Sequence, residues 1–326
     1  MFALMLLSGC SLVTDHFGAA ADPTNVEPIE VKVPAGTSPR TVGSVLASAH
    51  VIDSADDFTM YVRITKEGSC LKAGRFRLSR SMDAAAILET LCGVPLPEDV
   101  PFTIVEGWRI REIDAALVAK GWTSPGEYAA LAADPGKFTA PFALPAGTLE
   151  GYLFPETYMV IPDKWNTQAF VQRQIDTLSE RVFTPNKAAI ESSGRAFSDI
   201  VILASMLERE EPTPAQRPLV AGIIWKRLDS GWNLGIDATS RYELDEWNDR
   251  KAFLKKLRDP NDPYNSRLRQ GLPPTAIGNA GTSAFEAAIS PTPSEFWYYL
   301  HDSSGVLHPG RNSGEHEALR RKYNVY

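Results

Sequence analysis

The sequence lacks the short motifs that would assign it to several well-known enzyme classes. It contains no HExxH, no GxSxG, no GxGxxG and no P-loop, so it shows no sign of a zinc peptidase, a serine hydrolase or a nucleotide-binding protein. The nearest approach is His316-Glu317, where Arg320 stands in place of a second histidine. The five histidines and three cysteines also show no zinc-ligand spacing.

The chain also has fewer basic than acidic residues and lacks long apolar runs. The chain has 33 Lys and Arg against 40 Asp and Glu, a net charge of -7, and no basic run, so nucleic acid is a poor candidate partner. No uninterrupted apolar run reaches the roughly 18 residues of a membrane span. Apolar residues nevertheless make up 44% of the 326 residues, which is enough for one large domain or two smaller ones with packed cores.

The N-terminus carries a short apolar run that ends at Cys10. It resembles the end of a bacterial lipoprotein signal, in which the cysteine is lipidated, but no Lys or Arg precedes it. Three interpretations stay open: a longer signal with lipidation at Cys10, the end of a truncated membrane anchor, or a plain apolar N-terminus. If Cys10 is lipidated, Cys70 and Cys92 are left either as a disulfide pair in an oxidising compartment or as two buried thiols.

The order of predicted elements indicates an α+β fold with three parts. Residues 1–27 are interpreted as a signal or anchor remnant and a linker. Residues 28–98 are predicted to form a small domain, because a strand at 29–33 is followed by a helix capped by Ser38, a second helix, and another strand, a βααβ order. Residues 99–326 are predicted to form a larger mixed α+β domain in which helices dominate.

An apolar segment that ends in three glutamates is the first candidate for chemistry. Placed on a helix over 198–211, Glu210 emerges beside Leu203, Met206 and Leu207. A carboxyl held against apolar groups has a raised pKa, as a general acid needs at neutral pH. The alternative is an ordinary solvated glutamate at a helix end.

The stretch LEGYLFPETY, residues 149–158, is the second candidate. Glu150 and Glu156 flank Tyr152 and Pro155, and aromatic rings beside carboxylates suit a sugar, whose C–H face stacks on the ring. The alternative is an aromatic core strand with two acids on the surface.

Eight segments, in order, resemble one known family. They are VPAGTS, LKAGRFRLS, VEGWRIREI, LEGYLFPETY, LASMLERE, VAGIIWKRLDSGWNLGIDAT, YNSRLRQGLPPTAIGNAG and HPGRNSGEHEALRRKY. The sequence therefore resembles the endolytic murein transglycosylases, the MltG or YceG-like proteins of the bacterial cell envelope.

The resemblance implies a LysM-like, peptidoglycan-binding small domain and a catalytic larger domain. The enzyme would be a lyase that cuts nascent glycan strands between N-acetylmuramic acid and N-acetylglucosamine, leaves 1,6-anhydro ends and so stops strand elongation. It would need no metal or cofactor. It would be anchored in the inner membrane and face the periplasm, or be a lipoprotein through Cys10, with cell-wall synthases as expected partners.

The resemblance also assigns residues. Glu210 matches the catalytic glutamate, which would act alone, first as acid and then as base. The expected substrate-groove residues are Glu150, Tyr152, Pro155, Glu156, Glu208, Asp237, Thr239, Tyr264, Asn265, Gly271, Leu272, Pro273, Pro274, Asn279, His308, Glu315 and His316. Departures from the family pattern, such as Thr275 and Ala280, put details of the groove in doubt.

Two rival functions stay open at this point. One is a peptidoglycan-binding protein with a catalytically dead larger domain. The other is an ordinary glycoside hydrolase that pairs Glu210 with Glu150 or Glu156 across the scissile bond. An intact Glu210 argues against the first, and the chemical nature of the product would separate the second from a lyase.

Overall fold

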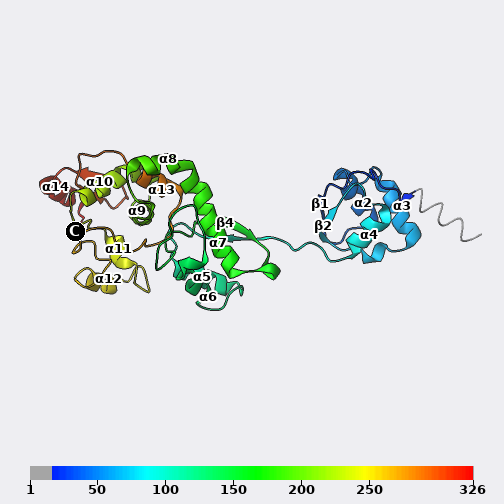
Figure 1. Ribbon diagram of the computed structural model, residues 1–326, viewed down its shortest axis with the longest axis horizontal. Helices are drawn as coiled ribbons and strands as arrows, with labels where there is room; N and C mark the ends of the chain where they lie inside the picture. Colours follow the sequence, from blue (N-terminus) through cyan, green and yellow to red (C-terminus); the bar gives the residue numbers. More distant parts are fainter. Residues whose placement is uncertain (1–16, 326) are drawn as a thin grey trace, which may run out of the picture. The chain divides into compact units, whose positions relative to one another are not determined.

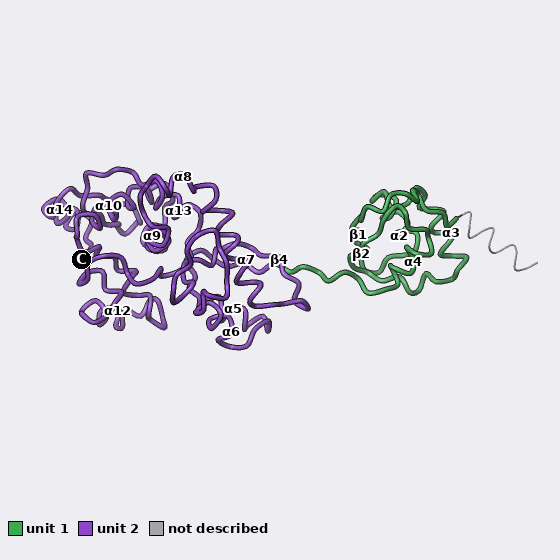
Figure 2. Tube along the Cα trace, in the orientation of Figure 1, with its two compact units in different colours: residues 1–100 green, residues 101–326 purple. Residues whose placement is uncertain are grey.

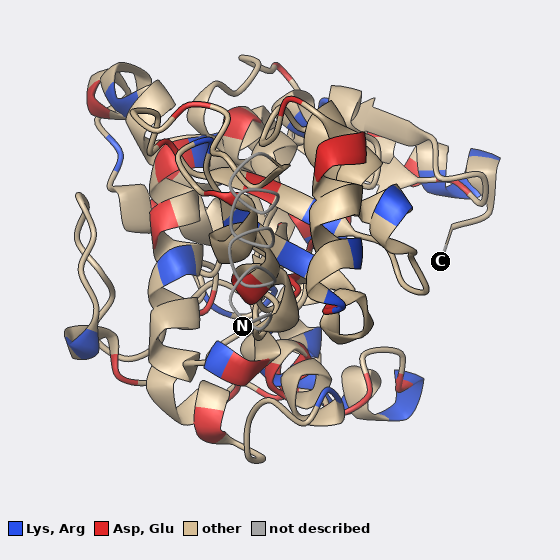
Figure 3. Cartoon of the chain, turned by 90° about the vertical axis from the view of Figure 1, so that its right-hand side faces the viewer, with Lys and Arg blue, Asp and Glu red and all other residues tan. Residues whose placement is uncertain are grey.

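The computed structural model describes residues 17–325, which form two compact units. The first unit extends to Val100 and the second begins at Pro101 (Figures 1 and 2). Cys10 lies outside the described residues. In Figure 3 the Lys and Arg residues are interspersed with Asp and Glu residues over the described elements. No described helix is both long and apolar enough to cross a membrane.

The first unit is a two-stranded sheet covered by helices. Strands β1 and β2 pair antiparallel, with Val31 opposite Phe76, and alternate residues such as Val33 and Leu78 point into the core. Its elements are β1 (Ile29–Val33), α2 (Pro39–Ser48), α3 (Ala55–Thr65), β2 (Gly74–Leu78) and α4 (Ala84–Cys92). The predicted βααβ order is therefore present and is followed by a further helix; its likeness to LysM stays a prediction.

Each of these three helices begins at a side-chain cap. Ser38, Ser54 and Asp83 accept hydrogen bonds from backbone N–H groups three residues later, at 3.2, 3.1 and 2.8 Å. Such caps satisfy N–H groups that have no partner within the helix, each worth about 1 kcal/mol. Sequence patterning and local hydrogen bonds therefore agree in this unit.

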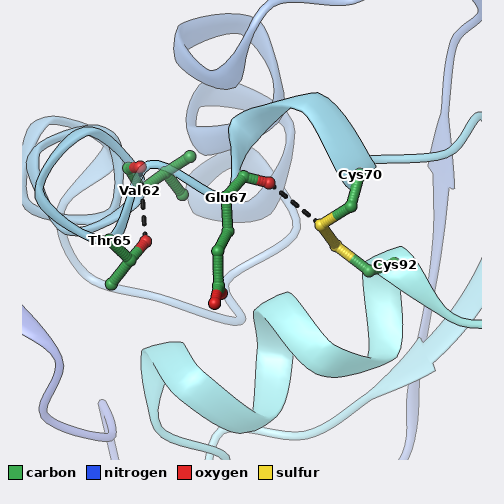
Figure 4. Close-up of a disulfide and its surroundings, with 5 residues drawn as sticks. All are labelled: Val62, Thr65, Glu67, Cys70 and Cys92. Atoms are coloured by element: carbon green, nitrogen blue, oxygen red, sulfur yellow. Dashed lines mark hydrogen bonds between the residues drawn. A yellow bond between two sulfur atoms is a disulfide. The ribbon is translucent and has the colours of Figure 1, made fainter.

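A disulfide joins Cys70 to Cys92, 22 residues apart (Figure 4). It ties the turn Gly68–Cys70 to the last residue of α4. Closing a loop of this length restricts the unfolded chain and stabilises the folded unit by about 3 kcal/mol. Of the two alternatives for this cysteine pair, a disulfide or two buried thiols, the structure contains the disulfide.

The second unit is mostly helical, with two small two-stranded sheets, β3–β4 and β5–β6. The fold is therefore α+β, as predicted. The elements are β3 (Val100–Thr103), α5 (Ile110–Ala119), α6 (Glu127–Ala132), β4 (Thr157–Val160), α7 (Thr167–Leu178), α8 (Thr184–Ser193), α9 (Phe197–Glu210), α10 (Arg217–Asp229), α11 (Asp237–Arg241), α12 (Arg250–Lys256), α13 (Thr282–Ile289), β5 (Tyr298–His301), β6 (Leu307–Gly310) and α14 (Ser313–Tyr323).

Helix α9 is the central element of this unit, and α10 and α13 pack against it (Figure 1). Its apolar residues from Ile200 to Leu207 are nearly all buried. Helix α10 approaches the chain beyond α13 so closely that a Cβ on Gly222 would lie 1.9 Å from the carbonyl oxygen of Thr292. The packing therefore fixes α9 on several sides and sets the position of its C-terminal end.

Candidate active site

The charged end of α9 sends consecutive side chains in different directions. Successive helical residues are separated by about 100°, so Glu208, Arg209 and Glu210 leave the helix toward different neighbours. Glu211 follows as the C-cap, with extended backbone angles and its N–H bonded to the carbonyl of Leu207 at 2.9 Å. The predicted helix over 198–211 thus ends one residue early, and each charged group must be considered separately.

Glu208 is held in a buried ion pair. Its carboxylate lies 2.7 Å from one guanidinium nitrogen of Arg217, and both side chains are less than 10% exposed. It also accepts the backbone N–H of Gly281 at 3.0 Å. A buried charge with a matched partner is costly to disrupt, so Glu208 fixes the loop before α13 and does not face a cleft.

The side chains of Arg209 and Glu211 also bond to other parts of the protein. The Arg209 guanidinium donates to the carbonyl of Gly107 and lies 4.2 Å from the ring centroid of Trp247. The Glu211 carboxylate is wholly buried; it accepts the N–H of Thr213 at 2.7 Å and lies 2.9 Å from Nε2 of His301.

Glu210 differs from its neighbours because it lines a cleft of about 960 Å³. The Tyr299 hydroxyl donates to its Oε1 at 3.3 Å. Burial, with the negative charge of Asp237, raises the pKa of Glu210, while His301, this hydrogen bond and Arg227 oppose the rise. A carboxyl whose pKa is raised and that borders an open cleft is suited to act as a general acid.

One wall of the cleft is aromatic. Trp232, which is 40% exposed, lies 4.5 Å from Trp297 and 6.0 Å from Tyr298 between ring centroids. His316 stacks on Tyr298 at 5.1 Å. Flat apolar faces beside a few polar groups suit the C–H face of a pyranose ring.

Charged side chains also line the cleft. Asp237 pairs with Arg267 at 2.7 Å. The guanidinium of Arg227 donates to the carbonyls of Trp297 and Leu234, at 2.7 and 2.5 Å, and burial lowers its pKa. These bonds hold the Arg227 guanidinium beside the aromatic residues, 5.7 Å from the ring centroids of Tyr298 and Tyr299.

A second, smaller hollow of about 160 Å³ adjoins the cleft, because Gln270 lines both. Several residues that the sequence predicted for the groove lie here: Tyr264, Gly271, Leu272, Pro273 and Pro274. The main cleft contains three others: Glu210, Asp237 and His316.

Glu150 is not in the cleft, although it was predicted for the groove. It is 2% exposed, and its carboxyl accepts the N–H of Ile110 at 3.2 Å, the Tyr242 hydroxyl at 3.1 Å and the Asn279 amide at 3.3 Å. Burial raises its pKa to about 7. Glu150 therefore links α5 to two distant loops.

Asn279, Thr239 and Asn265 are likewise wholly buried. Asn279 accepts the N–H groups of Gly151 and Leu153, each at 3.0 Å. Thr239 donates to the carbonyl of Ile236 at 2.8 Å. Asn265 donates to carbonyls at and just beyond the end of α12, to that of Lys256 at 3.0 Å. Each side chain satisfies backbone groups that would otherwise be buried without partners.

The segment 149–158 belongs to the core. Tyr152 contacts Phe142 and Phe197, with centroids 6.1 and 6.4 Å apart, and Pro155 is buried beside it. Glu156 lies at the surface and pairs with Arg181 at 3.0 Å. The alternative interpretation agrees with the structure in its buried aromatic residues and in Glu156, but Glu150 is buried and only the last two residues of the stretch belong to a strand, β4.

The remaining two predicted groove residues lie near the C-terminal hairpin, outside the lining of the cleft. His308 lies 2.8 Å from Asp302 and stacks on Tyr323 at 3.8 Å. Glu315 accepts the N–H of Arg311 at 2.8 Å.

Sequence reasoning missed several side chains that line the cleft: Arg227, Trp232, Tyr298, Tyr299 and His301. The run Trp297-Tyr298-Tyr299-Leu300-His301 was a usable signal. In a strand its alternate residues share a face, which places Tyr299 and His301 together. Among residues 17–325, no group of three or more His, Cys, Asp or Glu side chains is arranged to hold a metal ion.

Comparison with known proteins gives consistent matches. The model of the YceG-like family matches residues 31–322. A Bacillus subtilis protein named endolytic murein transglycosylase is 28% identical over 308 residues, covering 90% of this chain and 84% of the relative. A Streptococcus pneumoniae protein of the same name is 24% identical, and here the match covers 89% of this chain and 57% of the relative.

The fold has a solved counterpart in a YceG-like protein from Listeria monocytogenes. Its crystal structure matches with a TM-score of 0.60 and 25% identity, over 90% of this chain and 99% of that one. Together with the cleft and the carboxyl on its wall, these matches define the class of the protein: an enzyme of the lytic transglycosylase type, a lyase. The chain belongs to the YceG-like family.

Proposed function

We propose that this protein cuts nascent peptidoglycan strands internally, between N-acetylmuramic acid and N-acetylglucosamine, and leaves 1,6-anhydro-muramic ends that stop elongation. The observation that carries the proposal is Glu210, a carboxyl with a raised pKa on the wall of a large, aromatic-lined cleft. The names of the relatives from Bacillus and Streptococcus support murein as the substrate.

Glu210 starts the reaction as a protonated acid. It gives its proton to the glycosidic oxygen as the bond to the anomeric carbon breaks, and the hydrogen bond from Tyr299 stabilises the carboxylate that results. The 6-hydroxyl of the same muramic residue attacks the anomeric carbon. Because this nucleophile is tethered to the reacting sugar, the enzyme mainly has to hold one conformation, and the Trp232 wall is suited to that.

The positions of the other glutamates argue against the hydrolase alternative. A hydrolase places its two carboxyls on either side of the scissile bond, roughly 5 to 9.5 Å apart. Glu150 is closed inside the second unit and Glu156 pairs with Arg181 at its surface. Neither lines the cleft with Glu210. Asp237 does, but its carboxylate is paired with Arg267.

The enzyme is proposed to work at the cell envelope. The first unit is proposed as a LysM-like module that binds glycan strands. The protein is proposed to be anchored at the inner membrane through its N-terminal segment, or through lipid on Cys10, with the catalytic unit in the periplasm beside cell-wall synthases. The disulfide Cys70–Cys92 supports an oxidising compartment outside the cytoplasm.

The test is a digest of purified, uncrosslinked glycan strands, with products read by mass spectrometry. Wild-type protein should yield anhydro-muramic ends, and Glu210→Gln should yield none. Glu156→Gln, which alters a surface acid outside the cleft, serves as the matched control and should cut like wild type. Reducing ends would instead establish hydrolysis, and intact strands with retained binding would establish a binding protein.

A further inference from the structure

A buried pair of side chains lies directly beside the proposed acid. Glu211 follows Glu210 in the chain and is wholly buried. One of its oxygens accepts the N–H of Thr213, and the other lies 2.9 Å from Nε2 of His301. The His301 ring, in turn, lines the same cleft as Glu210.

The strand that carries His301 also carries Tyr299, and both residues line the cleft. In β5, Tyr299 and His301 lie on the same side, 6.1 Å apart between ring centroids. Tyr299 contacts Glu210 and His301 contacts Glu211. A carboxylate that accepts the Nε2 proton leaves Nδ1 as the basic nitrogen. Within residues 17–325, Nδ1 of His301 has no hydrogen-bond partner.

The reaction needs two proton transfers at two different oxygens. The leaving oxygen gains a proton, and the attacking 6-hydroxyl loses one. A single carboxyl must serve both positions in turn, whereas two groups on the cleft wall can each serve one.

We propose that His301 is a second catalytic residue, the base for the 6-hydroxyl, and that Glu211 positions it. The inference rests on the proposed function. As the bond between the anomeric carbon and the leaving oxygen breaks, that oxygen takes the proton of Glu210. The 6-oxygen bonds to the anomeric carbon and its proton moves to Nδ1 of His301. The Glu211 carboxylate stabilises the imidazolium. Water then carries this proton back to Glu210, so no proton is consumed overall.

The decisive measurement is chemical rescue on uncrosslinked strands. His301→Ala should lower kcat by about 100-fold and change KM only slightly, because general-base catalysis contributes roughly that factor. Added imidazole should restore the rate at least about tenfold, since a free base can enter the space left by the ring. A merely structural histidine would give a loss that imidazole does not repair.

Glu211 gives a second, independent arm. Glu211→Gln should lower kcat about tenfold through the orientation of His301, and the double variant should be no slower than His301→Ala within a few-fold. His301→Ala leaves the buried Glu211 carboxylate without its histidine partner, whereas the double variant, His301→Ala with Glu211→Gln, removes that charge. The imidazole rescue is therefore measured on the double variant as well, as a control for misfolding. His50→Asn, which removes an imidazole from the first unit at a left-handed position that asparagine tolerates, should behave as wild type.

The outcomes separate this inference from the proposed function. Two results would overturn the inference and leave the proposed function in place. One is a kcat of His301→Ala within threefold of wild type. The other is a fall in kcat that imidazole does not reverse in either the single or the double variant. If wild-type protein forms no anhydro ends, the proposed function fails first and the base assignment fails with it.

Discussion

Glu150 and Glu210 are two carboxyls with raised pKa values and tyrosine donors that differ in their other hydrogen bonds and in access to a cleft. Both carboxyls lie inside the second unit, burial raises the pKa of both, and each accepts a hydrogen bond from a tyrosine, Tyr242 or Tyr299. Glu150 is closed in by donors from α5 and the Asn279 loop. Glu210 has a cleft of about 960 Å³ in front of it.

The comparison shows that a raised pKa alone does not mark a catalytic acid. Protein donors occupy the oxygens of Glu150, so its carboxyl links parts of the fold. Glu210 accepts one donor from the protein and borders space for a sugar, so its proton can reach a substrate. Mutations that alter one carboxyl without the other can therefore separate the structural from the catalytic use of a buried acid.

The largest expected difference is in activity. Glu210→Gln should lower kcat by about 1,000-fold or more with an unchanged thermal midpoint, because the proton donor is lost. Glu150→Gln should retain kcat within a few-fold at a temperature where it is folded. The measurement is the rate of anhydro-end formation by both variants and wild type. Equal losses from both substitutions would remove the distinction between the two sites.

The next difference is in the pH dependence of stability. The folded pKa of Glu150, about 7, exceeds its ordinary 4.5, so its contribution is complete below about pH 4.5 and is lost as pH rises through about 7. The loss amounts to about 3 kcal/mol in the free energy of unfolding. Urea unfolding at pH 5 and pH 8 should show a smaller decline for Glu150→Gln than for wild type. Glu156→Gln, at the surface, should decline as wild type does.

A smaller effect is expected at the aromatic wall, which has no counterpart at Glu150. Trp232→Ala should raise KM about tenfold, equivalent to about 1.4 kcal/mol of binding free energy, and change kcat by a few-fold at most. Initial rates over a range of strand concentrations measure it. Leu254→Ala, at a residue with similar exposure of 41% outside the cleft, should leave KM unchanged; an equal rise there would show that the effect is not specific to the wall.

The smallest effect tests the two tyrosine donors. Tyr299→Phe removes a hydrogen bond that lowers the pKa of Glu210, so the acid should stay protonated to higher pH. The upper limit of the kcat/KM profile should move upward by less than about one pH unit. Tyr242→Phe removes the equivalent donor from Glu150 and should leave the profile in place. A downward shift with Tyr299→Phe would contradict the assignment of Glu210 as the acid.

Prediction from the sequence worked best where local rules act. The strand at 29–33, the Ser38 cap and the helix before Gly93 follow from side-chain alternation and capping, and the structure has all three. Glu210 was selected from its place beside an apolar stripe, and the structure puts its carboxyl at the edge of the core and the cleft. Asn265 and Asn279 lie buried outside the cleft lining, a placement that the sequence could not give, because a polar side chain near a loop looks the same whether it faces a ligand or bonds buried backbone groups.

The sequence by itself determined the family and the α+β class, and it selected Glu210 as the proposed acid, since these depend on periodicity and on segments contiguous in the chain. Only the tertiary structure decided which residues share the cleft. Trp232, Tyr299 and His301 meet Glu210 because α10 and β5 pack near the end of α9, across separations of up to about 90 residues. Donors from α5 and from the Asn279 loop enclose Glu150 away from the cleft, and no local pattern in the sequence records whether a buried carboxyl faces a cleft or a hydrogen-bond donor.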